Sequence, residues 1–439
     1  MSDRYRLFSW EHSYFSGKVR AYLRYKQYFD DLDDGYEDIL ATPELIQGLL
    51  VPATGSNVVP QVLTPRGDWL HDSSEIIDRC EHRHRRQPVI PGPDLPRQRL
   101  AAYLVELLAD EWMIVYGFWE RWHYSLAGST PNQLDFNAQQ WGAFMNPRGT
   151  GSERRATAQF MFKQNMSLDD PANAVQGPYS GLVELGMTEH TKDAWIASHR
   201  RIMDILETHF DAHDFVLGGR PSLADFGLLG PLYAHLFRDA VPGFEMRIEY
   251  PLVAEWVERT NGTNALNARS YNQQLYHLDS NGQLVGEVAT SDGGEWLADD
   301  AIPTTLEPLI DVFFEEMWPT LQASLHALRV YLNSEAHTPG AELPGKSFTA
   351  TQGFEALQRG DGPLTHSFQI GGVTARRTVM PYHAWMLQRV AAANNLDTEI
   401  AGQSLTELPA LLEGCRVKKV AGRLYEDALM NHRTQENPI

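Results

Sequence analysis

The chain has 439 residues, of which 43% are hydrophobic and 21% are charged, a balance typical of a soluble globular protein with two or three domains. The formal net charge of −20 argues against nucleic acid and anionic membrane surfaces as partners, because their phosphate groups would be repelled. The sequence has neither an apolar signal segment at its start nor a run long enough to span a membrane, so we expect a cytoplasmic protein.

The first predicted elements are a short buried strand at 5–10 and a helix over 17–25, where apolar residues recur at helical spacing. Ser13 stands at the expected N-cap of this helix, and Ser16 lies one turn further on the same face. Unpaired N–H groups and the positive end of the helix dipole meet there, which favours a bound anion such as a thiolate. Two serines that only cap the helix are the alternative.

A strand, a turn and a second strand are predicted next, followed by another helix. Pro60 can open the first of these strands without breaking its hydrogen-bond ladder. The turn at 66–68 leads into the second strand, and the helix begins near Ser73. Asp72 and Ser73 form a polar helix start. Such a start can hold an ammonium group on the carboxylate and a carboxylate on the hydroxyl and N–H groups.

A proline-rich linker at 86–96 precedes a series of predicted helices. The apolar spacing predicts one long helix over 100–124 and another over 191–210. Ser222 and Asp225 have the spacing of a Ser-x-x-Asp capping box, which here would begin a buried helix.

The last part of the chain is predicted to be mostly helical. A boundary near 261–281 is rich in Asn, Gly and Ser. Beyond it we expect helices over 300–333, 382–392 and 404–429, and one β-hairpin over 365–379, where side chains alternate about a Gly-Gly pair.

The order of these N-terminal elements, with Val59-Pro60 and Asp72-Ser73 at their positions, resembles the glutathione-binding domain of the glutathione transferase superfamily. That domain is an α/β thioredoxin-like fold. The stretch 217–229 resembles the capping box and buried helix of the superfamily's all-α second domain. The resemblance implies a thioredoxin-like domain, an all-helical second domain and a mostly helical C-terminal extension with a β-hairpin, at 1–86, 97–262 and 280–439 respectively.

The resemblance also implies a chemistry. Ser13 matches the first position of the superfamily's active-site motif, where a serine hydroxyl stabilises the thiolate of bound glutathione. The implied reaction is attack of that thiolate on a small hydrophobic electrophile, with glutathione as cosubstrate and no metal. Ser16 is the second catalytic candidate, although a structural role is favoured for it. A cysteine in place of Ser13 would have implied redox chemistry instead.

Glutathione would be held by the segments before the third strand and at the start of the following helix. The resemblance implies that the Val59 backbone, preceding a proline that is cis in the superfamily, binds the cysteinyl part. Asp72 and Ser73 would bind the γ-glutamyl end. Many relatives carry Gly-Lys immediately before the Val-Pro pair, where this sequence has Asn57 and Val58. The glycyl carboxylate therefore lacks one expected cation.

Aromatic residues are unusually dense over 110–124. Four side chains recur there at helical spacing and could line an apolar site for the electrophile: Trp112, Tyr116, Trp119 and His123. The alternative, that they form a core stripe, is slightly favoured because aromatic side chains dominate core burial.

Two other functions remain open. A non-catalytic glutathione-transferase-like binding or scaffold protein would fit the missing cation and the long extension, and a glutathione-dependent lyase or isomerase would differ only in the electrophile. The resemblance further implies a homodimer. Cys80 and Cys415, the only cysteines, form no disulfide framework, which agrees with a reducing compartment. No cysteine-rich zinc pattern is present in the sequence.

Overall fold

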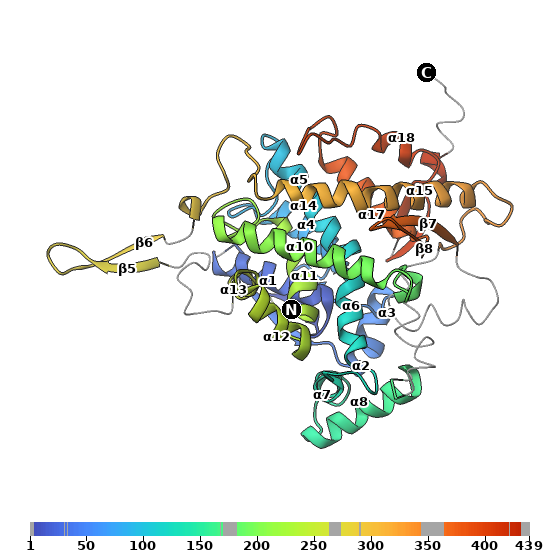
Figure 1. The fold of residues 1–439 in the computed structure, drawn as a ribbon, viewed down its shortest axis with the longest axis horizontal. Coiled ribbons are helices and arrows are strands. Elements are labelled where there is room, and N and C mark those ends of the chain that lie inside the picture. Colours follow the sequence, from blue (N-terminus) through green and yellow to red (C-terminus); the bar gives the residue numbers. More distant parts are fainter. Residues whose placement is uncertain are drawn as a thin grey trace. The chain divides into compact units, whose positions relative to one another are not determined.

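The computed structural model describes residues 4–29, 31–32, 34–166, 168–169, 182–262, 274–288, 291–343, 364–420 and 422–431 (Figure 1). The chain forms two compact units, each assembled from separated stretches. The first comprises residues 1–41, 59–113 and 201–311, and the second comprises residues 42–58, 114–200 and 312–439. The division into three consecutive domains stays a prediction, because each unit interleaves pieces of the predicted domains.

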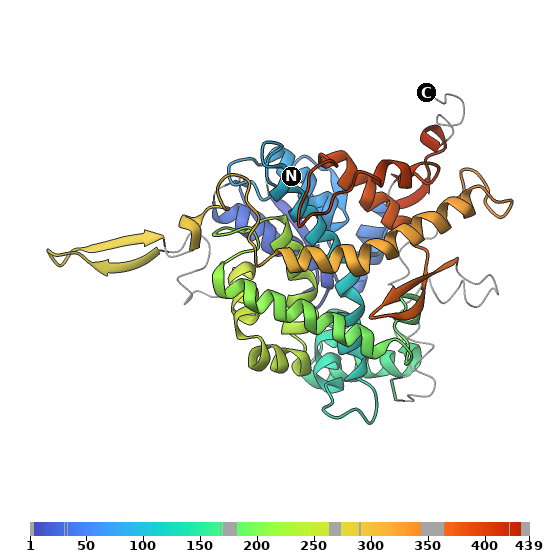
Figure 2. The same cartoon turned by 45° about the horizontal axis from the view of Figure 1, so that its top comes forward.

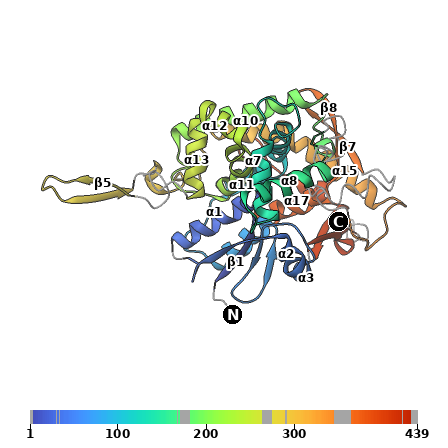
Figure 3. The same cartoon turned by 90° about the horizontal axis from the view of Figure 1, so that it is seen from below.

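A four-stranded mixed sheet lies in the first unit (blue arrows in Figure 3). Its strand order is β2-β1-β3-β4, and the strands are β1 (Tyr5–Ser9), β2 (Tyr36–Leu40), β3 (Gln61–Leu63) and β4 (Trp69–His71). β1 is parallel to β2 and antiparallel to β3, which is antiparallel to β4. The two parallel strands need a crossover, and α1 (Tyr14–Tyr28) supplies it. With α4 (Ser73–Arg83) after β4, this is the expected thioredoxin-like arrangement.

The strand register decides which connections of the sheet lie near one another. Phe8 pairs with Gln61, which in turn pairs with His71. This row crosses the carboxyl end of β1, the amino end of β3 and the carboxyl end of β4. The loop before α1, the segment before β3 and the start of α4 therefore all lie at the same end of the sheet.

The rest of the first unit is mainly helical. It contains α5 (Pro96–Leu108), the π-helical turn η2 (Ala109–Met113), α11 (Leu223–Pro231), η4 (Leu232–Phe237), α12 (Ala240–Glu249) and α13 (Pro251–Asn261). α11 is buried along its whole length and packs against α1 and α5. It begins with the predicted capping box, in which Asp225 accepts the Ser222 N–H at 2.8 Å. α10 (Lys192–Ala212) contributes residues to both units.

The second unit contains the remaining helices and two hairpins. Its elements are α2 (Pro43–Leu45), η1 (Ile46–Leu50), α3 (Val51–Thr54), α6 (Ile114–His123), α7 (Leu134–Met145), α8 (Gly151–Met166), η6 (Phe313–Met317), α15 (Trp318–Leu332), β7 (Thr365–Ile370), β8 (Val373–Thr378), α17 (Pro381–Ala393), α18 (Leu408–Leu412), β9 (Val417–Val420) and β10 (Arg423–Glu426). α15 packs against β7, and Figure 2 shows the two side by side. The β7–β8 hairpin turns at Gly371-Gly372, both of positive φ, as the sequence predicts.

The long helix expected over 100–124 is confirmed: α5, the π-helical turn η2 and α6 run without a break from Pro96 to His123. Two other helix predictions were wrong in extent. The helix expected from residue 300 begins only with α14 (Glu307–Val312), because Asp299 and Asp300 have φ of 57° and 55°, outside the right-handed helical region. The Asp300 carboxylate instead accepts the N–H groups of Arg97 and Gln98 at 2.9 Å each, and so caps α5.

Two hairpins were not predicted. Where one helix was expected over 404–429, the described residues form α18, then β9 and β10, and a last helical turn that begins at residue 428. In the β9–β10 hairpin Val417 and Leu424 are buried and a left-handed Gly422 makes the turn. In a further hairpin, β5 (Gln274–Leu278) lies within the expected boundary segment 261–281 and its partner β6 (Leu284–Val288) lies just after it. Throughout the described ranges, no helix has the length and apolar character needed to span a membrane.

Candidate functional site

Ser13 occupies the N-cap position of α1 in an extended conformation, with φ −83° and ψ 132°. Its backbone N–H donates to the Trp10 carbonyl oxygen at 3.0 Å, and its side chain is half-buried. The hydroxyl makes no capping hydrogen bond within the described part of α1. Because the first turn of this helix carries no acidic residue, its positive end is not neutralised locally. A ligand at this point would meet the Ser13 hydroxyl and the positive end of the helix dipole.

The neighbouring hydroxyl groups are engaged inside the protein. Ser16 is fully buried, and its oxygen accepts the Trp10 N–H at 3.3 Å. Tyr14 is 4% exposed and donates its hydroxyl to the Ala109 carbonyl at 2.6 Å. Burial, with smaller contributions from nearby carboxylates, raises the pKa of Tyr14 well above its ordinary value. Of these three side chains, Ser13 is therefore the one placed to interact with a ligand.

The segment before β3 and the start of α4 contain the predicted glutathione-binding residues. The peptide bond between Val59 and Pro60 is cis; Val59 is half-buried and Pro60 is buried. Asp72 has φ +81°, which is uncommon for a non-glycine residue. Its carboxylate accepts the Ser74 N–H at 3.1 Å and the Glu75 N–H at 3.4 Å, so it caps α4. Ser73 is 5% exposed.

A buried ionic cluster contacts the first turn of α4 through Ser74. The Lys18 ammonium lies 2.7 Å from a carboxylate oxygen of Glu106 and 2.7 Å from one of Asp110, and it donates to the Ser74 hydroxyl at 3.2 Å. Each of these side chains is at most 2% exposed. Burial would lower the pKa of Lys18, but the two carboxylates outweigh it and raise that pKa. This cluster cannot be predicted from the local sequence pattern, because lysine on a helix normally faces solvent.

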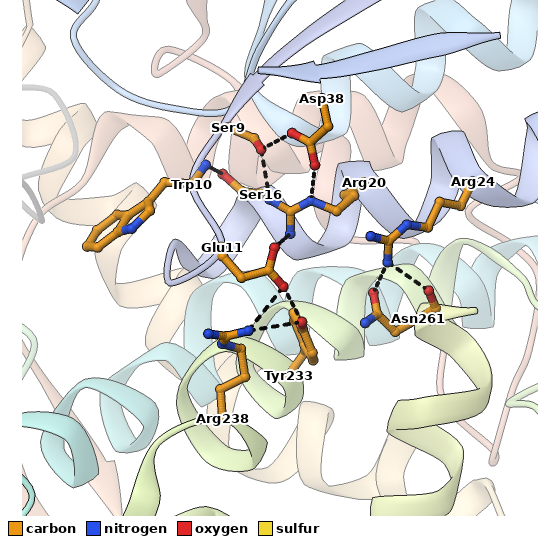
Figure 4. A network of polar contacts seen from close by, with 10 residues as sticks. All are labelled: Ser9, Trp10, Glu11, Ser16, Arg20, Arg24, Asp38, Tyr233, Arg238 and Asn261. Carbon is orange, nitrogen blue, oxygen red and sulfur yellow. Dashed lines mark hydrogen bonds and ion pairs between the residues drawn. The ribbon is translucent and has the colours of Figure 1, made fainter. Parts of the chain in front are cut away.

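A second ionic network surrounds the loop that carries Ser13 (Figure 4). Arg20 on α1 is 2% exposed. Its guanidinium contacts Glu11 at 2.9 Å and Asp38 at 2.5 Å, and donates to the Ser9 hydroxyl at 2.7 Å. Burial acts to lower the pKa of Arg20, but Glu11 and Asp38 outweigh it and raise that pKa. Arg20 therefore joins the loop to β1 and β2.

The other Glu11 carboxylate oxygen contacts helix η4 and the residue after it. It accepts the Tyr233 hydroxyl and lies 3.3 Å from the Arg238 guanidinium. Burial, and then Glu11, raise the pKa of Tyr233, so Tyr233 stays a neutral donor. The next loop residue, His12, is fully buried and lies 3.5 Å from the equally buried Asp239. Sequence analysis did not identify this network, whose partners are more than 220 residues apart.

The aromatic candidates are mostly buried. Trp112, in the first unit, is 1% exposed. In the second unit, Tyr116 and Trp119 are 8% and 7% exposed, and His123 is half-buried. The Trp119 and His123 rings stack with centroids 4.5 Å apart, whereas Tyr116 stacks on His199 at 3.7 Å. Burial, followed by Lys192, lowers the pKa of His123. These contacts bring three of the four candidates together on α6.

Neither thiol chemistry nor a metal centre is suggested by the remaining side chains. Cys80 on α4 is 1% exposed, and burial raises its pKa to about 12, so its thiol is protonated and inert. Cys415 is also buried. Within the described ranges, no group of three or more His, Cys, Asp or Glu side chains is placed to hold a metal ion.

Comparison with known proteins gives one family match. Residues 189–259 match the model of the glutathione S-transferase C-terminal domain, a span from the residues before α10 to near the end of α13. No curated protein matches the chain.

Similar solved structures include a glutathione S-transferase from Rhodospirillum rubrum F11, with 13% identity and a TM-score of 0.36, covering 68% of this chain and 96% of that one. A glutathione S-transferase from Methylobacterium radiotolerans has 19% identity and a TM-score of 0.32, and the match covers 63% of this chain and 98% of that one. The beta-etherase LigF from Sphingobium sp. strain SYK-6 has 16% identity and a TM-score of 0.39, and the match covers 60% of this chain and 98% of that one. With TM-scores this low, no conclusion about this chain rests on these likenesses.

Proposed function

We propose that this chain, whose residues 189–259 match the glutathione S-transferase C-terminal domain, binds glutathione and ionises its thiol for attack on a small hydrophobic electrophile. The observation that carries this proposal is the Ser13 hydroxyl, which stands at the N-cap of α1 without capping it. A hydroxyl and a helix N-terminus directed at one sulfur both favour the thiolate over the thiol.

In the proposed reaction the thiol loses its proton to solvent, and the Ser13 hydroxyl donates a hydrogen bond to the resulting thiolate. The sulfur then forms a carbon–sulfur bond with the electrophile, and a leaving group such as chloride departs with its electron pair. Ser13 is not itself a nucleophile in this scheme. Ser16 contributes by holding the loop, since its hydroxyl oxygen is occupied by the Trp10 N–H.

The rest of glutathione is proposed to lie along the same end of the sheet, where the register brings the three connections together. The Val59 backbone would pair with the cysteinyl part, beside the cis bond to Pro60. The Ser73 hydroxyl and backbone N–H would receive the γ-glutamyl carboxylate, and the Asp72 carboxylate its ammonium. Weak binding is expected at the glycyl end, because Asn57 and Val58 carry no charge.

Of the four aromatic candidates for an electrophile site, His123 is the one that is half-buried. The exposures of 1%, 8% and 7% in Trp112, Tyr116 and Trp119 favour packing roles for these three. We also propose a homodimer, as the superfamily resemblance implies; sedimentation velocity would distinguish a dimer from a monomer.

The test compares the unchanged full chain with Ser13→Ala and with Ser13→Thr, which keeps a hydroxyl. Calorimetry measures glutathione binding, the ultraviolet absorbance of the thiolate measures the thiol pKa of the complex, and 1-chloro-2,4-dinitrobenzene reports conjugation. We expect binding with a lowered thiol pKa, and a loss of about 100-fold in kcat/KM in Ser13→Ala that Ser13→Thr largely avoids.

Each other result has a defined meaning. Absence of glutathione binding by the unchanged chain rejects the proposed function. Binding with an unshifted thiol pKa and no turnover supports a non-catalytic binding protein instead. Binding with a lowered thiol pKa but no conjugation of this electrophile points to a lyase or isomerase with a narrower substrate.

A further inference from the structure

We propose that Glu11 and Arg238 tune the ionisation of the glutathione thiol at Ser13, through opposite charges held beside the N-terminus of α1. This inference rests on the proposed function and adds two positioning residues to it. Neither is assigned as a group that contacts the reacting atoms.

The loop before Ser13 is held by side-chain contacts. The two residues immediately before Ser13 are both attached to the same helical region. Glu11 accepts the Tyr233 hydroxyl and pairs with Arg238 at 3.3 Å, and His12 lies 3.5 Å from Asp239. The loop is therefore fixed by contacts outside α1.

Close packing holds the same region against α1. A Cβ atom added at Gly17 would lie 3.0 Å from the Tyr233 ring, so a larger residue there would require the ring to shift by a few tenths of an ångström. The ring that hydrogen-bonds Glu11 is thus pressed against the first turns of α1. Movement of η4 would be transmitted directly to the Ser13 loop.

Glu11 lies close to Ser13 in the chain. The Cα atoms of Glu11 and Ser13 are two residues apart, which limits their separation to about 7 Å. The Glu11 carboxylate extends from its Cα atom, and the Arg238 guanidinium lies 3.3 Å from that carboxylate. Nearby charges act on the ionisation of a group, and the sign of each charge decides the direction. A carboxylate opposes a second anion, whereas a guanidinium favours it.

The Glu11 carboxylate pairs with two arginines. One Glu11 oxygen is paired with Arg20 and the other with Arg238 (Figure 4). Arg20 is 2% exposed and also pairs with Asp38, whereas the Arg238 side chain is 25% exposed and that of Glu11 38% exposed. Glu11, Arg238 and Asp38, whose side chain is 34% exposed, are thus the partly exposed members of the network, and Arg20 is its buried member. The charge of Glu11 or of Arg238 can be removed without emptying the buried position of Arg20.

The two charges predict shifts of opposite sign. Glu11→Gln removes a negative charge but keeps an oxygen that can accept from Tyr233, so the thiol pKa of bound glutathione should fall. Arg238→Met removes a positive charge but keeps the length of the side chain, so that pKa should rise. At this separation we expect shifts of about half to one unit, and the double variant should return close to the starting value.

Opposite signs separate a charge effect from structural damage, which would weaken binding in both variants alike. Arg24→Met serves as the matched control. It removes the same charge from α1, where Arg24 donates to the backbone and side-chain oxygens of Asn261. Arg24 lies eleven residues beyond the N-cap, about 16 Å along the helix, so it should leave the thiol pKa unchanged.

The experiment titrates the thiolate absorbance of glutathione bound to the full chain, and the pH profile of kcat/KM, in all five proteins. A fall in Glu11→Gln and a rise in Arg238→Met support the inference. No shift, or shifts of the same sign, in variants that still bind glutathione overturn it and leave the proposed function intact. Absence of binding by the unchanged chain overturns both. Should Glu11→Gln fail to fold, the direction of the Arg238→Met shift alone decides.

Discussion

The Trp10 amide donates a hydrogen bond of 3.3 Å to the hydroxyl oxygen of Ser16, across the loop between β1 and α1. This bond distinguishes two serines that look equivalent in the sequence. It occupies the hydroxyl oxygen of Ser16 inside the protein, while Ser13, on the same loop, keeps a hydroxyl that does not cap the helix.

Replacing Ser16 should therefore cost stability, whereas replacing Ser13 should not. Ser16→Ala removes a buried acceptor from the Trp10 N–H, and we expect a loss of about 1–3 kcal/mol in the free energy of unfolding. Ser13→Ala removes no capping bond and should change it by less than about 0.5 kcal/mol. Urea denaturation followed by tryptophan fluorescence measures both. Equal stabilities of the two variants would contradict this division of roles.

The buried cluster around Lys18 should be sensitive to loss of its cation. Lys18→Met leaves the Glu106 and Asp110 carboxylates buried without the ammonium that lies 2.7 Å from each. We expect a loss of about 3–5 kcal/mol at neutral pH. The loss should shrink as pH falls, since protonation of a carboxylate removes the uncompensated charge.

Lys192→Met is the matched control for this variant. Lys192 pairs with Glu189 at 2.9 Å, but the Glu189 side chain is 89% exposed. Removing such a surface pair should cost no more than about 1 kcal/mol. Thermal denaturation over a range of pH compares the two, and a Lys18→Met variant as stable as Lys192→Met would refute the expected importance of the cluster.

Asp225 should give the chain a pH-dependent stability between pH 4 and pH 6. Burial raises its pKa from 3.8 to about 6, although it accepts hydrogen bonds from Val216, Ser222 and Trp256. Because the folded-state pKa lies above the unfolded one, the folded protein binds the proton more tightly. Its contribution is fully present below about pH 4 and is lost as pH rises through about 6.

The measurement is the difference in unfolding free energy between the unchanged chain and Asp225→Asn, which cannot titrate. The unchanged chain should lose up to about 3 kcal/mol relative to the variant between pH 4 and pH 7. Asp225→Asn is also expected to be the less stable protein at every pH. The amide NH2 of asparagine is a donor, and it would face N–H groups that donate to the carboxylate in the unchanged chain. Parallel curves would show that Asp225 does not titrate in this range.

The elements that the sequence predicts well are those with a local signal. The N-cap at Ser13, the start of α4 at Ser73, the Ser222–Asp225 capping box and the turn at Gly371-Gly372 each rest on a few adjacent residues. The β9–β10 hairpin was missed because its strands are four residues each, too short for an alternation to be distinguished from a helical pattern.

What the sequence alone determined is the frame of the site: which helices begin beside the sheet, and which hydroxyl and carboxylate stand at their first positions. Tertiary structure decided which of these groups form hydrogen bonds or ion pairs inside the protein. Lys18 meets Glu106 across 88 residues and Glu11 meets Tyr233 across 222. Partners so distant leave no periodic trace in the chain, because a buried ion pair depends on which surfaces pack together and not on local backbone preference.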